Sequence, residues 1–180
     1  MSFADFCGNK QYNINTLVQD DEEAMQVTCA SMSASESTWP IRVKTLRLQF
    51  LYDLTDMSQF SVFSNVEHFV MENTGWECDF SALVKLTKLK KFAWRHSNYT
   101  EQPPFGSLHF LEGSRDSIQV VDIICVGCAQ EGVDLTPLLA CQKLELLDIS
   151  HSYVYRAQLD QLAEQLPNLE IDGLKTARFL

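Results

Sequence analysis

Residues 142–150 of the chain read QKLELLDIS, and this short stretch decides the fold class. Its apolar residues Leu144, Leu147 and Ile149 are spaced by three positions and then by two. Spacing by two is typical of a β-strand that buries one face. Because one short strand cannot bury its apolar face alone, this stretch predicts neighbours of the same kind.

The same apolar spacing recurs along the chain. Occurrences start at residues 43, 66, 89, 118, 144 and 166, at intervals of 23, 23, 29, 26 and 22 residues. Six occurrences at such a period indicate a repeat architecture in which the repeats stack on one another. The residues at these positions are Val43, Leu46 and Leu48; Val66, Phe69 and Met71; Leu89, Phe92 and Trp94; Ile118, Val121 and Ile123; Leu144, Leu147 and Ile149; and Leu166, Leu169 and Ile171.

A second pattern precedes three of these strands. It begins with an aspartate at Asp56, Asp79 or Asp134, has Ser or Thr two positions later, and continues with an apolar residue at every third position. Spacing by three predicts a helical or 3-10 turn with one buried face. The Asp or the Ser/Thr can cap the first turn by accepting backbone N–H bonds.

Together the two patterns resemble the leucine-rich-repeat family, whose consensus is L-x-x-L-x-L-x-x-N-x-L. The resemblance covers about residues 40–174. It implies an α/β fold: a curved solenoid with a parallel β-sheet on the concave face and short helices, 3-10 turns and loops on the convex face. At the consensus asparagine, whose side chain bonds neighbouring backbone, this chain has Leu51, Thr74, Ser97, Val126 and Ser152. Thr and Ser can replace that bond more weakly, whereas Leu and Val cannot.

The chain divides into an N-terminal capping segment, residues 1–39, and about six leucine-rich repeats with a short C-terminal cap, residues 40–180. Alternating apolar residues around Ile14 and Val27 predict a hairpin-like cap. At the other end Leu174 and Phe179 are candidates to close the array, although the sequence is equally compatible with a longer one. Pro103-Pro104 lie in the longest interval and predict a bulge on the convex side.

The N-terminal part of the chain contains the run Val27-Thr28-Cys29, then Pro40, and then the first repeat from Val43 to Leu48. This order resembles the cysteine cap of extracellular Toll-type leucine-rich-repeat proteins. That resemblance implies a disulfide between Cys7 and Cys29. The first residues have no basic flank and no apolar run, so they are unlike a secretory signal. This favours a cytoplasmic location, and an extracellular one is the alternative.

Composition narrows the classes of partner. The net charge is −10 with no basic cluster, which disfavours nucleic-acid binding. No stretch of about 18 apolar residues is present, so no membrane span is expected.

Side chains that could carry chemistry are scattered. Cys125 and Cys128 form a lone C-x-x-C without the second pair that zinc needs, and the repeat places Cys128 and Cys141 inward as small buried hydrophobes. His68, His96 and His151 fall at exposed strand positions, and the last two are too far apart to share a metal. We therefore expect no catalytic residue, metal or cofactor.

The outward strand residues form the predicted partner-binding surface. Its first three repeats offer basic residues, its last three offer acidic residues, and its middle offers the apolar Val120, Ile124 and Leu146. An apolar centre with a charged surround is typical of a protein interface. The predicted contact residues are Arg47, His68, Glu72, Lys91, Arg95, Val120, Asp122, Ile124, Leu146, Asp148 and Glu170.

The sequence thus predicts a non-catalytic module that binds a protein through the concave sheet, as an intracellular adaptor or scaffold. One alternative is an extracellular recognition domain of a Toll-type or secreted immune protein. Another is a regulatory subunit of an enzyme complex, such as a ubiquitin ligase substrate receptor. The partner and the oligomeric state remain open.

Overall fold

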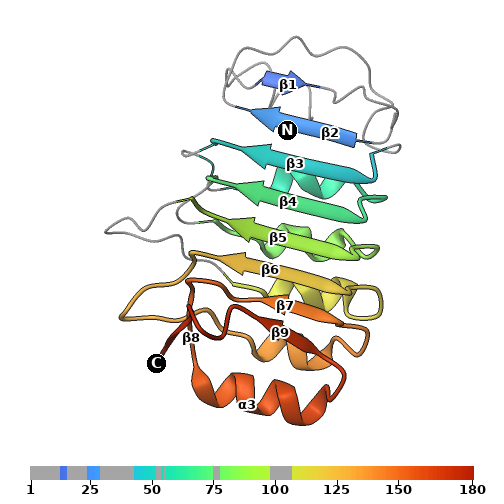
Figure 1. Cartoon of the computed structure of the whole chain (residues 1–180). Coiled ribbons are helices and arrows are strands. Elements are labelled where there is room, and N and C mark those ends of the chain that lie inside the picture. Colours follow the sequence, from blue (N-terminus) through green and yellow to red (C-terminus); the bar gives the residue numbers. More distant parts are fainter. Residues whose placement is uncertain are drawn as a thin grey trace.

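A sheet of stacked strands organises the chain (Figure 1). The computed structural model describes residues 13–15, 24–28, 43–51, 54, 56–74, 78–97 and 107–180, the first two ranges as backbone only. The sheet has eight strands in the order β1-β2-β3-β4-β5-β6-β7-β9. They are β1 (Asn13–Asn15), β2 (Ala24–Thr28), β3 (Thr45–Gln49), β4 (His68–Glu72), β5 (Lys91–Arg95), β6 (Val120–Ile124), β7 (Leu146–Asp148) and β9 (Glu170–Asp172).

All neighbouring strands from β2 to β9 are parallel, and their registers align the repeats. Leu46 of β3 lies opposite Phe69 of β4, and Phe69 lies opposite Phe92 of β5. The buried positions predicted for the first five repeats are therefore confirmed. β1 pairs antiparallel with β2, as the alternation around Ile14 and Val27 predicts.

The sixth repeat is shifted by two residues from its predicted register. Ile171, rather than Leu169, lies opposite Leu147. The reason is that Leu166 ends a helix, and the backbone N–H of Leu169 bonds its carbonyl at 2.9 Å. Phe63 and Val66 form the same turn in an earlier repeat, at 3.0 Å. Leu166 and Leu169 therefore correspond to Phe63 and Val66, in the turn that precedes the strand, and not to residues of the strand itself.

Short helices cover one face of the sheet; in Figure 1 most of them lie behind the strands, and the last lies below β9. They are the 3-10 helices η1 (Ser58–Val62), η2 (Ser81–Lys85), η3 (His109–Ser114) and η4 (Thr136–Ala140), and the α-helix α3 (Arg156–Gln165). This alternation of parallel strand and short helix is that of a leucine-rich-repeat solenoid, which confirms the predicted fold class.

Aspartates begin three of the 3-10 helices as predicted. The Oδ1 atoms of Asp56, Asp79 and Asp134 accept N–H bonds from the residues two positions later, at 2.8, 2.9 and 3.0 Å. At η3 the same bond, at 3.2 Å, goes to the hydroxyl of Ser107. The sequence pattern was defined by its aspartate, so it missed this serine.

The core lies between the sheet and the helices. Trp94 is fully buried there, as predicted, and its ring meets that of Phe80 edge-on with centroids 5.0 Å apart. Phe80 also lies 5.4 Å from Phe110 of the next repeat. Aromatic contacts therefore continue the core from one repeat to the next.

Two buried hydroxyls replace the consensus asparagine. Thr74 accepts the backbone N–H of Leu51 at 3.3 Å, and Ser152 accepts that of Val126 at 3.0 Å. Leu51 and Val126 have no polar side chain, but their backbone N–H groups bond to the hydroxyl of the following repeat. The predicted replacement by Thr and Ser is confirmed for these two positions. Ser97 is exposed and bonds Asn73 instead.

A small second sheet lies beside the last repeats. It pairs β8 (Tyr153–Val154) with β10 (Arg178–Phe179) in parallel. Phe179 lies against the guanidinium of Arg156, 5.2 Å from the ring centroid. We expected Leu174 and Phe179 to close the array, but they are 47% and 39% exposed and are not buried against the last repeat. Pro103-Pro104 lie outside the described residues, and the division into capping segment and repeats remains a prediction.

Ser152→Ala should lower the free energy of unfolding by about 2 kcal/mol, because it leaves the buried N–H of Val126 and carbonyl of Ile123 without the hydroxyl. Urea unfolding measures the change. Ser64→Ala, at an exposed turn, is the matched control and should stay within about 0.5 kcal/mol of wild type. Equal stability of the two variants would contradict the role given to Ser152.

Gly113→Ala should destabilise the fold by about 2 kcal/mol, because η3 packs on the backbone of η2 at this residue. A Cβ added to Gly113 would lie 2.0 Å from the carbonyl oxygen of Val84. Thermal unfolding tests this against Glu112→Ala, which changes an exposed side chain of the same helix. Equal melting of both variants would show that the two helices can separate without loss.

Candidate functional site

The strands present one face away from the helices, toward the reader in Figure 1. We call this the open face; it is the face that the sequence predicts to be concave. Strand pairing arranges its side chains in three rows across β3 to β9. The first row is Thr45, His68, Lys91, Val120, Leu146 and Glu170; the central row is Arg47, Val70, Ala93, Asp122, Asp148 and Asp172; the third row is Gln49, Glu72, Arg95 and Ile124.

All eleven predicted contact residues fall in these rows, but not all of them are accessible. His68 and Glu170 are exposed, and Asp122 is only 3% exposed. The remaining eight are half-buried: Arg47, Glu72, Lys91, Arg95, Val120, Ile124, Leu146 and Asp148. Asp122 therefore offers a partner little surface.

Asp122 instead holds two basic side chains of the neighbouring strand. Its Oδ2 lies 3.1 Å from Nζ of Lys91 and also contacts the guanidinium of Arg95. Arg95 lies 3.9 Å from Glu72, which in turn accepts a bond from the amide of Gln49. Because Asp122 is almost fully buried, these pairs are less screened than surface pairs. They compensate one another within the face.

The predicted charge polarity is changed by this network. The basic residues predicted for the first three repeats are Arg47, Lys91 and Arg95. Lys91 and Arg95 already form ion pairs with carboxylates of the same face. The acidic end is different: β7 and β9 contain Asp148, Glu170 and Asp172 and no basic residue. The open face is therefore acidic over its last two strands.

The sequence predicts one central apolar patch on this face, but the structure separates its residues. Val120 and Leu146 lie opposite each other in the first row. Ile124 lies in the third row, with Asp122 between it and Val120 on the same strand. The face thus has one apolar pair and a separate isoleucine. Two further apolar residues, Val70 and Ala93, are adjacent in the central row but 6% and 0% exposed.

His96 is buried, whereas the sequence placed it on the surface. His68 and His151 are exposed as predicted. His96 follows β5, and its backbone N–H still bonds the carbonyl of Ile124 at 3.0 Å. Its ring lies 6.4 Å from that of Trp94, edge-on. Burial lowers the pKa of His96 to about 4.

The cysteines of the C-x-x-C stretch lie differently from each other. Cys125 is buried, as is Cys141, but Cys128 is half-buried instead of inward, because it forms a tight turn with Glu131. Burial raises the pKa of Cys141 to about 11, so its thiolate is disfavoured. Cys7 and Cys29, the proposed disulfide, lie outside the described residues.

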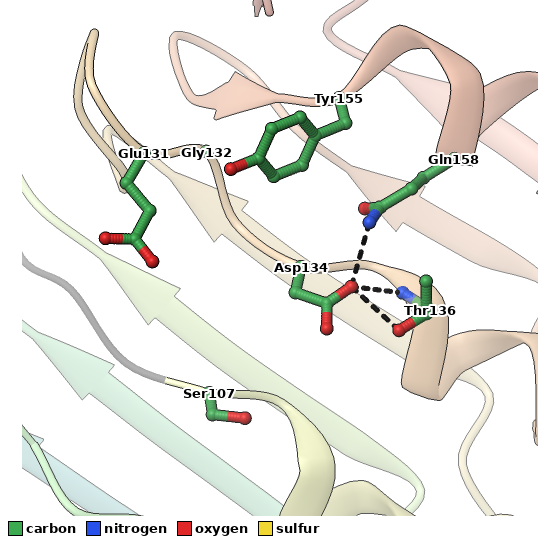
Figure 2. Close-up of a pocket in the computed structure, with 7 residues that line it drawn as sticks. All are labelled: Ser107, Glu131, Gly132, Asp134, Thr136, Tyr155 and Gln158. Atoms are coloured by element: carbon green, nitrogen blue, oxygen red, sulfur yellow. Dashed lines mark hydrogen bonds between the residues drawn. The ribbon is translucent and has the colours of Figure 1, made fainter.

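An open polar pocket of about 450 Å³ lies beside η4 and α3. Figure 2 shows seven of the residues that line it. The pocket was missed from the sequence because its residues come from segments far apart in the chain. They are Ser107, Glu131, Gly132, Asp134, Thr136, Tyr155 and Gln158.

The carboxylate of Asp134, in the middle of this pocket, is already hydrogen-bonded to neighbouring residues. Oδ1 of Asp134 accepts bonds from the backbone N–H and hydroxyl of Thr136, at 3.0 and 2.8 Å, and from Nε2 of Gln158, at 2.9 Å. Burial acts to raise the pKa of Asp134, but these hydrogen bonds outweigh it and hold the pKa below its usual value. Asp134 therefore joins η4 to α3 as a charged hydrogen-bond acceptor.

Two other classes of site, a membrane span and a metal centre, find no candidate in the described residues. No helix in the described ranges is long and apolar enough to cross a membrane. Within the same ranges, no group of three or more His, Cys, Asp or Glu side chains could hold a metal ion.

Comparisons with known proteins found similar chains among solved structures only. No family model matches the sequence, and no curated protein matches it. Among solved structures, an internalin from Listeria monocytogenes matches 84% of this chain with 14% sequence identity and a TM-score of 0.49. This chain spans 47% of the internalin chain. At this identity no residue role carries over.

His96 should make the fold sensitive to acid. An unfolded histidine takes up a proton near pH 6.5 and the folded one near pH 4, so lowering the pH through this window favours the unfolded chain. Between pH 7 and pH 5, the free energy of unfolding should fall by about 2 kcal/mol more in wild type than in His96→Asn.

Urea unfolding at the two pH values measures this difference. His68→Asn is the matched control, because His68 is exposed on the same sheet, and it should keep the wild-type pH dependence. A His96→Asn variant with that same dependence would show that another group causes it.

Proposed function

We propose that this chain is a non-catalytic adaptor or scaffold that binds a protein partner through its open face. The observation that carries the proposal is the half-buried apolar pair Val120 and Leu146 on a sheet face turned away from the helices. Repeat solenoids of this kind offer extended surfaces on which partners bind.

The position of the apolar pair supports a contact with protein. Single exposed apolar residues are ordinary on protein surfaces, so one alone would carry little weight. Val120 and Leu146 are neighbours on adjacent strands, bordered by Lys91 on one side and Glu170 on the other. An apolar contact surrounded by charges excludes water at its centre and orients the partner at its rim.

The rigidity of the face supports the same role. Its side chains stand on paired strands, and the ion pairs around Asp122 fix Lys91 and Arg95 before any partner arrives. A surface whose side chains are already ordered loses less conformational entropy on binding. A regulatory subunit of an enzyme complex would use the face in the same way.

Leu146→Arg should remove the partner, because it places a long charged side chain where an apolar contact is proposed. The amount of protein that copurifies with the tagged chain from its native source should fall at least tenfold. A tenfold loss of affinity corresponds to about 1.4 kcal/mol of binding free energy. Val84→Arg is the matched control, since Val84 is an exposed valine on η2, among the helices. Thermal unfolding should show both variants folded.

Two results would contradict the proposal. One is an unchanged set of copurifying proteins with Leu146→Arg. The other is an equal loss with Val84→Arg, which would indicate binding through the helical side.

A further inference from the structure

We propose that the partner segment on the β6–β9 part of the open face is cationic: a peptide in which Lys or Arg side chains stand next to an apolar one. This inference rests on the proposed function and names the chemistry of its partner. We call the receiving surface the acidic end; it consists of Val120, Leu146, Asp148, Glu170 and Asp172.

Strand register brings like charges together at the acidic end. Asp148 lies directly opposite Asp172, and also opposite Asp122 on its other side. Neighbouring strands are about 4.8 Å apart, so the three aspartates occupy adjacent positions in one row. Like charges directly opposite one another destabilise a sheet. A bound cation would relieve this repulsion.

The acidic residues of this region differ in whether a basic side chain forms an ion pair with them. Asp122 contacts both Lys91 and Arg95. Among the described residues, no ion pair joins a basic side chain to Asp148, Glu170 or Asp172. Asp148 accepts one hydrogen bond, from the backbone N–H of Ser150 at 2.9 Å. Compensation therefore stops at β6, and the charge that a partner could meet lies on β7 and β9.

The apolar pair sets the pattern of the partner. Leu146 lies opposite Val120 on one side and Glu170 on the other, and Asp148 follows two residues later on the same strand. Across the strands the backbone position of Glu170 is thus about 4.8 Å from that of Leu146, and along the strand that of Asp148 is about 6.6 Å away. These distances suit basic residues one or two positions from the apolar residue in an extended peptide.

Other ligands of an acidic surface fit less well. A metal ion needs several ligands that converge, and no such group occurs within the described ranges. Side chains in one row of a sheet stand roughly parallel instead of converging on a point. An anionic partner would add to the repulsion. A row of carboxylates beside an apolar pair suits several cationic groups spread along a chain.

The test uses two labelled ten-residue peptides, one with alternating Lys and Leu and one with alternating Glu and Leu. Their binding to the whole chain is measured by fluorescence anisotropy. Because the chain has a net charge of −10, general attraction must be separated from binding at the acidic end. The open-face variant Asp148→Asn with Asp172→Asn removes two charges there, and the amide oxygen introduced by Asp148→Asn can still accept the N–H of Ser150.

The matched control removes two charges from α3 instead, by Asp160→Asn with Glu164→Gln; both residues are exposed. We expect the Lys/Leu peptide to bind wild type and the α3 variant with similar affinity, and the open-face variant at least tenfold more weakly. The Glu/Leu peptide should not bind. The open-face variant should also melt no lower than wild type, because repulsion between strands is removed.

Three results would overturn the inference: equal weakening by both double variants, binding of the Glu/Leu peptide, or no binding of the Lys/Leu peptide. The proposed function is tested separately by Leu146→Arg and copurification. If that variant loses its partners while the two double variants bind the Lys/Leu peptide alike, the open face binds a partner that is not cationic.

Discussion

The stacking of one buried strand residue on the next is the constraint on which this molecule depends. Leu46, Phe69, Phe92, Val121, Leu147 and Ile171 lie opposite one another along the sheet. From Phe69 to Leu147 each apolar side chain has a neighbouring repeat on both sides, and at the end of the sheet Ile171 is half-buried, so no repeat has a complete core of its own. The same register that stacks the buried residues also aligns the outward ones, and the rows of the open face follow from it.

Much of this arrangement could be predicted from the sequence because the period of the side chains is a local property. Spacing by two indicates a strand, spacing by three indicates a 3-10 turn, and an aspartate two residues before a hydroxyl indicates a cap. The last repeat shows the limit of this reasoning. Leu166 and Leu169 have the spacing of the residues that lead into a strand elsewhere in the chain. Here they follow the helix α3, which ends at Gln165, and the strand is shifted by two residues.

The site was less predictable, because its properties depend on distances between repeats. The outward positions of Arg95 and Asp122 follow from alternation, but their ion pair depends on how far a guanidinium reaches across to the next strand. His96 lies just past the regular strand, where alternation no longer determines the direction of a side chain, and it is buried beside Trp94. The pocket around Asp134 joins residues from 107 to 158, which no local pattern connects.

Along the central row, one geometry has two electrostatic outcomes. Asp122 borders a strand with two basic residues and is neutralised inside the fold, whereas Asp148 and Asp172 border one another. The repulsion between them is a stability cost that the stacked core sustains, since Leu147 and Ile171 next to them still face inward. A basic or neutral residue at position 148 or 172 would remove that cost, so stability of the fold alone does not account for two aspartates here. Charge left uncompensated beside a half-buried apolar pair favours a role in binding, because a partner of opposite charge gains affinity and orientation where the free chain bears repulsion.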